Sequence, residues 1–256
     1  MIVTPTVLGL LAAASFGAGF VDAIAGGGGL ISLPALLAAG LPAHLALGTN
    51  KGQATFGAVS SAVSYWRRGA IDRGRAPVAF VCALIGALIG AAILLAVKPE
   101  PLRPVVIGLL VAAAVVVTAR PHSEGRGLAQ RWQRPALVAV TLLLGAYDGF
   151  FGPGVGTMLI VAFSLIHGDG EARASGNAKV ANLASNLAAL ILFSYRGTVL
   201  WTVALPMAAA NALGAAAGAR MALARGDRFV RVVALVVVSA LIVKLAFDWV
   251  RTLRPG

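Results

Sequence analysis

The chain has 256 residues, of which 59% are hydrophobic and only 12% charged, and its formal net charge is +12. Average globular chains carry about 25% charged residues, so this composition excludes an ordinary soluble domain and predicts an all-α polytopic membrane protein. The positive charge does not indicate nucleic-acid binding. The arginines gather in short stretches between apolar runs, as they do in the cytoplasmic loops of membrane proteins.

Ten apolar segments are predicted, in chain order at about 3–22, 29–41, 48–66, 76–97, 102–119, 135–149, 155–167, 176–195, 199–223 and 229–250. The segments at 29–41 and 155–167 have about 13 residues each. A helix needs roughly 20 residues to cross a bilayer, so each of these two is too short to span it upright. We expect each to be a short or broken piece that forms a hairpin with the segment before it.

The ten segments divide into two sets of five that resemble repeats. Asp22 is matched by Asp148 at an offset of 126, and Lys51 is matched by Lys179 at an offset of 128. We expect a first transmembrane repeat at 1–119, a basic cytoplasmic linker at 120–134 and a second transmembrane repeat at 135–256. Transporters are often built from two such halves, with the binding site at their interface.

Loop charge predicts the orientation of the two halves. The stretches 67–75, 120–134 and 220–231 are strongly basic, so we place them in the cytoplasm. The segments at 48–66, 76–97 and 102–119 then cross the membrane once each, and each hairpin returns to the side from which it entered. This predicts two inverted repeats in the cell inner membrane, with both termini outside the cytoplasm.

Glycines interrupt both halves where the hairpins turn. Gly26, Gly27, Gly28 and Gly29 are consecutive, and Gly152 and Gly154 lie at the matching place in the second half. Glycine costs about 1 kcal/mol per interior helical position, so a helix is expected to stop at each break. The next helix would begin with unpaired N–H groups and the positive end of its dipole, which together favour an anion. The alternative is a kink that only permits close packing.

Charged and amide side chains lie inside otherwise apolar segments, where they are expensive and usually functional. Lys51 and Lys179 are expected to bind an anion, although lysines near a segment end can also extend toward the membrane surface. Asp22 and Asp148 either carry protons between the two faces or hold the lysines in ion pairs. The amides expected to complete the pocket are Asn50, Gln53, Asn177 and Asn182.

These residues form a pattern that resembles the sulfite exporter TauE/SafE family of membrane permeases. The resemblance runs from Asp22 through the four glycines to Leu37 and continues from His44 through Asn50 and Lys51 to Gly57. It is weaker at 148–156 and 176–197, where Pro153 interrupts the glycines. The resemblance implies transport of sulfite, sulfonates or sulfoacetate, driven by the proton gradient.

We therefore expect a secondary transporter, in the sense of an exporter, that moves small organosulfur anions by alternating access. Its expected partners are the lipid bilayer, the anion and protons as coupling ion, with no cofactor and no metal. Glycine-rich faces would permit a homodimer. The alternatives are a passive anion channel, or a membrane-embedded enzyme acting on an anionic lipid or phosphate. The chain has no recognisable nucleophile–base motif, so we do not expect an enzyme.

Overall fold

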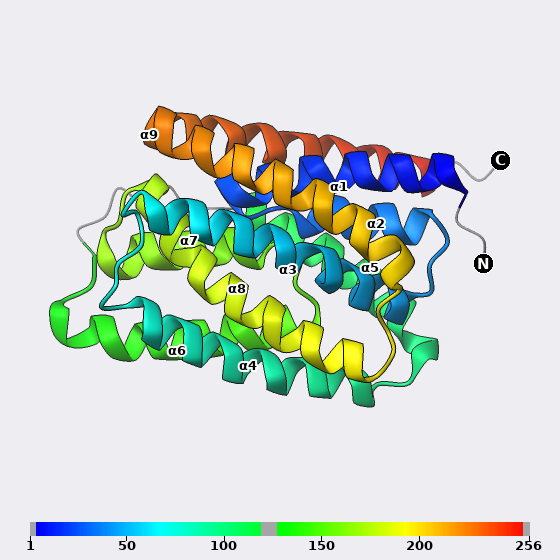
Figure 1. The fold of residues 1–256 in the computed structure, drawn as a ribbon, viewed down its shortest axis with the longest axis horizontal. Helices are drawn as coiled ribbons and strands as arrows, with labels where there is room; N and C mark the ends of the chain where they lie inside the picture. The colour runs from blue at the N-terminus through cyan, green and yellow to red at the C-terminus, as the bar shows by residue number, and fades with distance from the viewer. Residues whose placement is uncertain (1–3, 119–126, 253–256) are drawn as a thin grey trace.

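The computed structural model describes residues 4–118 and 127–252, and every regular element in these ranges is a helix (Figure 1). The predicted all-α class is therefore confirmed. In chain order the helices are α1 (Pro5–Ala25), α2 (Gly29–Ala38), α3 (Ala43–Arg67), α4 (Ala76–Ala96), α5 (Pro99–Thr118), α6 (Gln130–Phe150), α7 (Val155–His167), α8 (Glu171–Tyr195) and α9 (Trp201–Thr252).

The stretch 220–231, expected as a loop, is helical except at one residue. Gly226 has φ 69° and ψ −165°, and the two parts of α9 reverse direction there (Figure 1). Glycine lacks a Cβ and reaches positive φ without steric cost, so one residue is enough for the turn. The prediction of two segments at this place holds, but the prediction of a basic loop between them was wrong.

Three other helix starts differ from the predicted segments. Helices α3 and α8 begin at Ala43 and Glu171, five residues before the expected starts at 48 and 176. Residues 43–47 are mostly apolar and residues 171–175 mix alanine with polar side chains, and both stretches extend their helices toward the N-terminus. Helix α6 begins at Gln130, inside the range expected as the linker.

Among the described residues, four helical stretches are long and apolar enough to cross a membrane, namely α1, α4, α8 and Trp201–Val230 in α9. Large apolar side chains face outward on the helices: Leu10 of α1, Leu143 of α6 and Leu213 of α9 are 67%, 68% and 66% exposed. Lys51, Lys179 and Asp148 are buried instead. Such an apolar exterior around a polar interior suits a surrounding of lipid rather than water.

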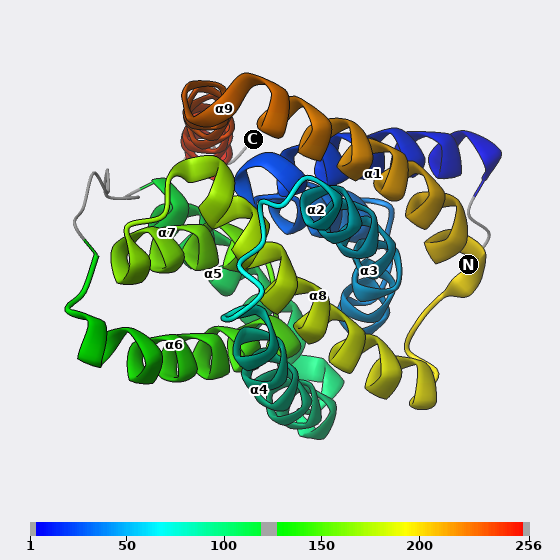
Figure 2. The same cartoon turned by 60° about the vertical axis from the view of Figure 1, so that its left-hand side comes forward.

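The two short helices fold back along the helices before them (Figures 1 and 2). Helix α2 has 10 residues and α7 has 13, as the sequence predicts. Helix α1 ends because Gly26 adopts the left-handed conformation at φ 78°, and its N–H bonds back to the Asp22 carbonyl. In the second hairpin the Tyr147 hydroxyl donates to the Pro153 carbonyl at 2.9 Å, which fixes the turn against α6.

Contacts between the first and second halves of the chain recur at matched residues. The N–H of Leu200 donates to Thr49 Oγ1 at 3.0 Å, and the N–H of Asp72 donates to Asn177 Oδ1 at 2.8 Å. The two bonds are matched across the repeat, because Leu200 lies 128 positions after Asp72 and Asn177 lies 128 positions after Thr49. The connections that follow α3 and α8 are therefore held in place by equivalent hydrogen bonds.

Glycine pairs allow the helices of the two halves to approach closely. A Cβ added at Gly86 would collide with the carbonyl oxygen of Leu142, and one at Gly214 would collide with that of Phe16. Gly90 and Gly218, one turn further along, are packed in the same way against α6 and α1. These glycine-rich faces are thus occupied within the chain, and they are not free to hold a second copy.

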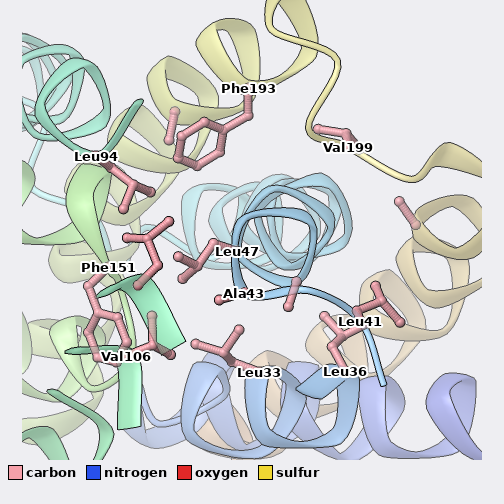
Figure 3. Packing of buried hydrophobic residues seen from close by; sticks show 14 of the residues in the cluster. Leu33, Leu36, Leu41, Ala43, Leu47, Leu94, Val106, Phe151, Phe193 and Val199 are labelled. Atoms are coloured by element: carbon pink, nitrogen blue, oxygen red, sulfur yellow. The ribbon is translucent and has the colours of Figure 1, made fainter. Parts of the chain in front are cut away.

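One end of the molecule is closed by apolar packing. Leu33 and Leu36 of α2, Leu47 of α3, Phe193 of α8 and Val199 belong to one buried cluster around the start of α3 (Figure 3). Burial of a leucine or phenylalanine side chain contributes about 1.5–3 kcal/mol, so this cluster is a large part of what joins the hairpins to the longer helices.

The opposite end is closed by ions. Arg75 donates to both carboxylate oxygens of Asp169, at 3.0 and 3.1 Å, and lies 2.9 Å from Asp72. Burial tends to raise the pKa of Asp72, but the hydrogen bonds from Arg75 and from the Gly74 N–H outweigh it and hold that pKa below its usual range. This ionic network joins the α3–α4 connection to the α7–α8 connection.

Candidate functional site

A polar pocket lies where the two helix breaks meet. It is lined by residues of both halves: Asp22, Gly26, Gly28, Gly29, Ser32, Asn50, Lys51, Gln53, Ala54, Asp148, Gly152, Gly154, Val155, Asn182, Asn186 and Asn211. The cavity is small, about 30 Å³. One water molecule needs roughly 10–15 Å³ by this measure, so the pocket admits only a compact ligand in this conformation.

The turns of the two hairpins touch each other directly. Thr157 of α7 donates its N–H to the Gly26 carbonyl at 3.2 Å and its hydroxyl to the Ala25 carbonyl at 2.6 Å. A Cβ on Gly26 would collide with the backbone of Gly156. Glycine is therefore required here for two reasons, the positive φ and the backbone-to-backbone approach.

Lys51 and Asp148 form a buried ion pair across the two halves, with Nζ 2.5 Å from Oδ1. Their side chains are only 3% and 2% exposed. The second oxygen of Asp148 accepts hydrogen bonds from Ser185 and, at 3.4 Å, from Asn182. An ion pair this deeply buried is stable only with such extra donors, because desolvation of the two charges is expensive.

The matched residues form the reciprocal pair. Lys179 Nζ lies 2.5 Å from Asp22 Oδ2, and Asp22 also accepts the N–H of Gly28 at 3.3 Å. Lys179 is fully buried, whereas Asp22 is 25% exposed and lines the pocket. The two pairs are thus not equivalent toward the pocket: one presents both its lysine and its aspartate, and the other presents only its aspartate.

Amide and hydroxyl groups form a connected network beside Lys51. Asn50 Oδ1 accepts hydrogen bonds from the Ser32 hydroxyl at 2.6 Å and from Gln53 Nε2 at 3.0 Å. Gln53 Oε1 in turn accepts from the Ser15 hydroxyl at 2.7 Å. Asn50 Oδ1 thus accepts two hydrogen bonds, which leaves the Asn50 amide N–H groups available to a ligand.

Backbone donors add to them at the helix starts. Leu30 and Ile31 bond back to the carbonyls of Gly27 and Gly28, at 3.1 and 3.0 Å, while the N–H of Gly29 has no hydrogen-bond partner among the described residues. Gly154, which precedes α7, likewise has an unpaired N–H within the described part of the chain. An ammonium group with such donors is suited to an anion.

Three of the predicted site residues do not line the pocket. Gly27 lies in the turn, where its carbonyl caps α2, and Lys179 lies behind Asp22. Asn177 is at the ionic end, where it accepts the N–H of Asp72 and donates to Asp169 at 2.8 Å. Its place in the sequence, two residues before Lys179, puts it on another side of α8.

Two polar lining residues, Ser32 and Asn211, were not among the predicted ones. Ser32 follows the glycines by one turn of α2, and Asn211 lies in α9. Asn186, one of the amides near Lys179 whose place in the sequence favours a polar pocket, also lines it. Asn211 donates to the Ser15 carbonyl at 3.0 Å. The signal that could have found it is an amide inside a long apolar segment, where a polar side chain usually has a function.

Each of four pocket amides is matched by an alanine in the other half of the chain. At an offset of 128, Asn50 is matched by Ala178 and Asn182 is matched by Ala54. Gln53 and Asn211 are matched in the same way by Ala181 and Ala83. Each of these amides is therefore present in only one half, so the two halves build one asymmetric pocket rather than two copies of the same site.

The chain matches known proteins over nearly its whole length. The model of a family described as Sulfite exporter TauE/SafE covers residues 11–245. The probable membrane transporter protein ORF9 of Sinorhizobium sp is 38% identical over 250 residues, covering 96% of this chain and 95% of the relative. The probable membrane transporter protein YfcA of Escherichia coli (strain K12) is 33% identical over 247 residues, covering 96% and 92%.

A probable membrane transporter protein of Haemophilus influenzae is 35% identical over 245 residues, covering 94% of this chain and 95% of the relative. No solved structure matches the chain. The family match, over residues 11–245, includes both hairpins and the four residues of the two ion pairs. The chain is a multi-pass membrane transporter, and it belongs to the sulfite exporter TauE/SafE family.

Proposed function

We propose that the protein is a secondary transporter, acting as an exporter, of small organosulfur anions such as sulfite, sulfonates or sulfoacetate. The observation that carries this proposal is the pocket between the two hairpins, which is lined by Lys51 and by Gly29 and Gly154, whose N–H groups have no partner among the described residues. The family description supports a sulfur oxyanion as the substrate. The small cavity favours sulfite, the most compact of these anions.

The residues of the pocket divide between charge and orientation. Lys51 supplies the positive charge, and the starts of α2 and α7 add their dipoles. Asn50, Gln53 and Asn182 orient the anion through their amide donors. Lys179 acts indirectly, because it holds Asp22 at the wall of the pocket.

Alternating access follows from two halves of inverted topology. The recurrence of contacts at matched residues, together with the reciprocal ion pairs Lys51–Asp148 and Lys179–Asp22, supports an approximate twofold relation between the halves. Transporters with such repeats rock one half against the other around a central site. The different closures of the two ends, one apolar and one ionic, would then open in turn.

Charge balance links the anion to a proton. Lys51, Lys179, Asp22 and Asp148 together carry no net charge when all four are ionised, and an anion at Lys51 would compete with Asp148 for it. Proton uptake by Asp148 removes this competition and keeps the buried site neutral. Asp148 is therefore the first candidate for proton coupling, and Asp22, which remains paired with Lys179, is the second.

The ionic end faces the cytoplasm in this proposal. The α3–α4 connection, the α7–α8 connection and the bend of α9 lie at one end of the molecule, while the start of α1 and the end of α9 lie at the other (Figure 1). The positive-inside rule then places the basic connections inside and both termini outside the cytoplasm.

Flux into liposomes tests the proposal. Purified protein should transport radiolabelled sulfite, and an imposed pH gradient should change the rate. Lys51→Met should abolish the flux, whereas Lys98→Met, which removes an exposed lysine, should leave it unchanged. If sulfite, sulfoacetate and taurine all fail to move, the proposal is wrong. Flux that ignores the pH gradient would indicate a passive channel.

A further inference from the structure

A second hollow, which shares no lining residue with the polar pocket, lies on the outer surface between α3, α4 and α8. It is lined by Ala62, Val63, Trp66, Arg67, Ile71, Ala76, Val180 and Leu183 and has a volume of about 290 Å³. Its walls are apolar except for Arg67. Trp66 and Val63 are 49% and 43% exposed, so apolar side chains along its rim remain accessible to a ligand.

Positive charge is concentrated at one end of this groove. Arg67 is the last residue of α3, and Arg73 stacks its guanidinium 5.3 Å from the centre of the Trp66 ring. The acidic group nearest in sequence, Asp72, is already paired with Arg75 and Arg173, at 2.9 and 3.2 Å. No carboxylate lines the groove, so an anionic group at Arg67 and Arg73 would meet no repulsion there.

We propose that this groove is a binding site for an anionic phospholipid. The phosphate would lie against Arg67 and Arg73, at the level where a tryptophan such as Trp66 marks the membrane interface. One acyl chain would follow the apolar floor formed by Ala62, Ala76 and Leu183. Basic grooves between transmembrane helices on the cytoplasmic side recognise anionic headgroups through the same combination of charge and apolar wall.

The position of the groove connects it to transport. It is formed by α3 and α8, the helices that carry Lys51 and Lys179, and Val180 directly follows Lys179. A lipid bound there would occupy the space into which α3 and α8 would otherwise move relative to each other. The bound lipid would therefore change the free energy required to open the ionic end, without contacting the pocket.

Native mass spectrometry of the purified protein tests this site, with phosphatidylglycerol and phosphatidylcholine of identical acyl chains as the two probes. Wild type should retain phosphatidylglycerol preferentially. Each arginine near a lipid surface contributes about fivefold in affinity, so Arg67→Ala with Arg73→Ala should weaken phosphatidylglycerol binding about thirtyfold. Ala62→Leu, which fills the floor, should weaken the binding of both lipids.

Arg68→Ala is the matched control, because Arg68 is exposed and its side chain does not line the groove. It should retain wild-type lipid binding. The proposal is overturned if wild type shows no preference for phosphatidylglycerol, or if Arg68→Ala loses as much affinity as the loss of Arg67 and Arg73. Circular dichroism confirms that each variant is folded, and the result does not depend on which anion the protein transports.

Discussion

At the scale of single residues, the protein buries charged side chains inside a bundle of apolar helices and pairs each with a side chain of opposite charge. Lys51 and Asp148 are almost fully buried, and neither charge would be stable there without the other. The pair is a structural element and, in the proposed function, also the group that an anion must disturb. Stability and transport should therefore respond differently when one or both partners are removed.

The first prediction concerns this pair. Lys51→Met leaves Asp148 buried without its cation, which should lower the free energy of unfolding by about 3–5 kcal/mol. Adding Asp148→Asn removes the orphaned charge and should restore much of that stability, but not sulfite transport. Thermal unfolding in detergent and liposome uptake measure the two effects. A double variant that still transports sulfite would show that Lys51 does not bind it.

The second prediction concerns the glycine at which the hairpin turns touch. Gly26→Ala should lower the free energy of unfolding by at least ~2 kcal/mol, because its positive φ disfavours a side chain and the Cβ would strike Gly156. Gly9→Ala is the control, since Gly9 is helical and has nothing within 4 Å of an added Cβ. It should leave stability unchanged or raise it by up to about 1 kcal/mol. Equal effects of the two changes would contradict the packing argument.

At the scale of elements, hairpins and connections define what can move. The hairpins are held by apolar burial around the start of α3, and the ionic connections are held by Arg75, Asp72 and Asp169. Apolar packing involves no charge and does not titrate. Ion pairs are weakened by salt, which screens the charges, and by low pH, which protonates the carboxylate. The two ends of the molecule should therefore be separable by solution conditions.

The third prediction uses the pH dependence of the ionic end. The folded-state pKa of Asp72 is lowered, so its stabilising contribution is present above the unfolded-state pKa of about 3.9 and is lost as pH falls through the folded value. Asp72→Asn should thus be less stable than wild type at pH 7, by less than about 1 kcal/mol because the group is partly exposed. The difference should close below about pH 4 in chemical unfolding experiments. A constant difference across this range would exclude the ion pair as its cause.

At the scale of the whole molecule, the two halves of the chain are interleaved rather than laid side by side. Helix α1 packs on α9, α4 packs on α6 and α8, and α3 packs on α8 and α9 (Figure 2). Most of these contacts join the first half to the second. The polar pocket and both ion pairs also need residues from each half, so neither half contains a complete site.

The fourth prediction follows from this interleaving. Residues 1–118 and 127–256, co-expressed as separate chains, should assemble and copurify, because the contacts between the halves do not depend on the covalent connection. Each half expressed alone should be rapidly degraded, since its glycine faces and buried charge would lack partners. Limited proteolysis in membranes measures both outcomes. A first half that is protease-resistant alone would show that the halves fold independently.

The sequence alone determined the class of the protein and predicted most of the residues that line its candidate site. Hydrophobicity and segment length predicted the helices and the short α2 and α7, because a bilayer restricts both composition and length. Buried charge is so costly in lipid that Lys51, Asp148 and Asp22 stood out without any structure. The glycine runs likewise marked the two breaks.

Only the tertiary structure decided which of these residues meet. It paired Lys51 with Asp148 and Lys179 with Asp22, carried Asn177 to the ionic end, and brought Asn211 into the pocket from α9. It also turned a predicted loop into a bend at Gly226 alone. Local sequence encodes the cost of burying a group and the freedom of a glycine, but partners separated by more than a hundred residues are selected by the packing of whole helices.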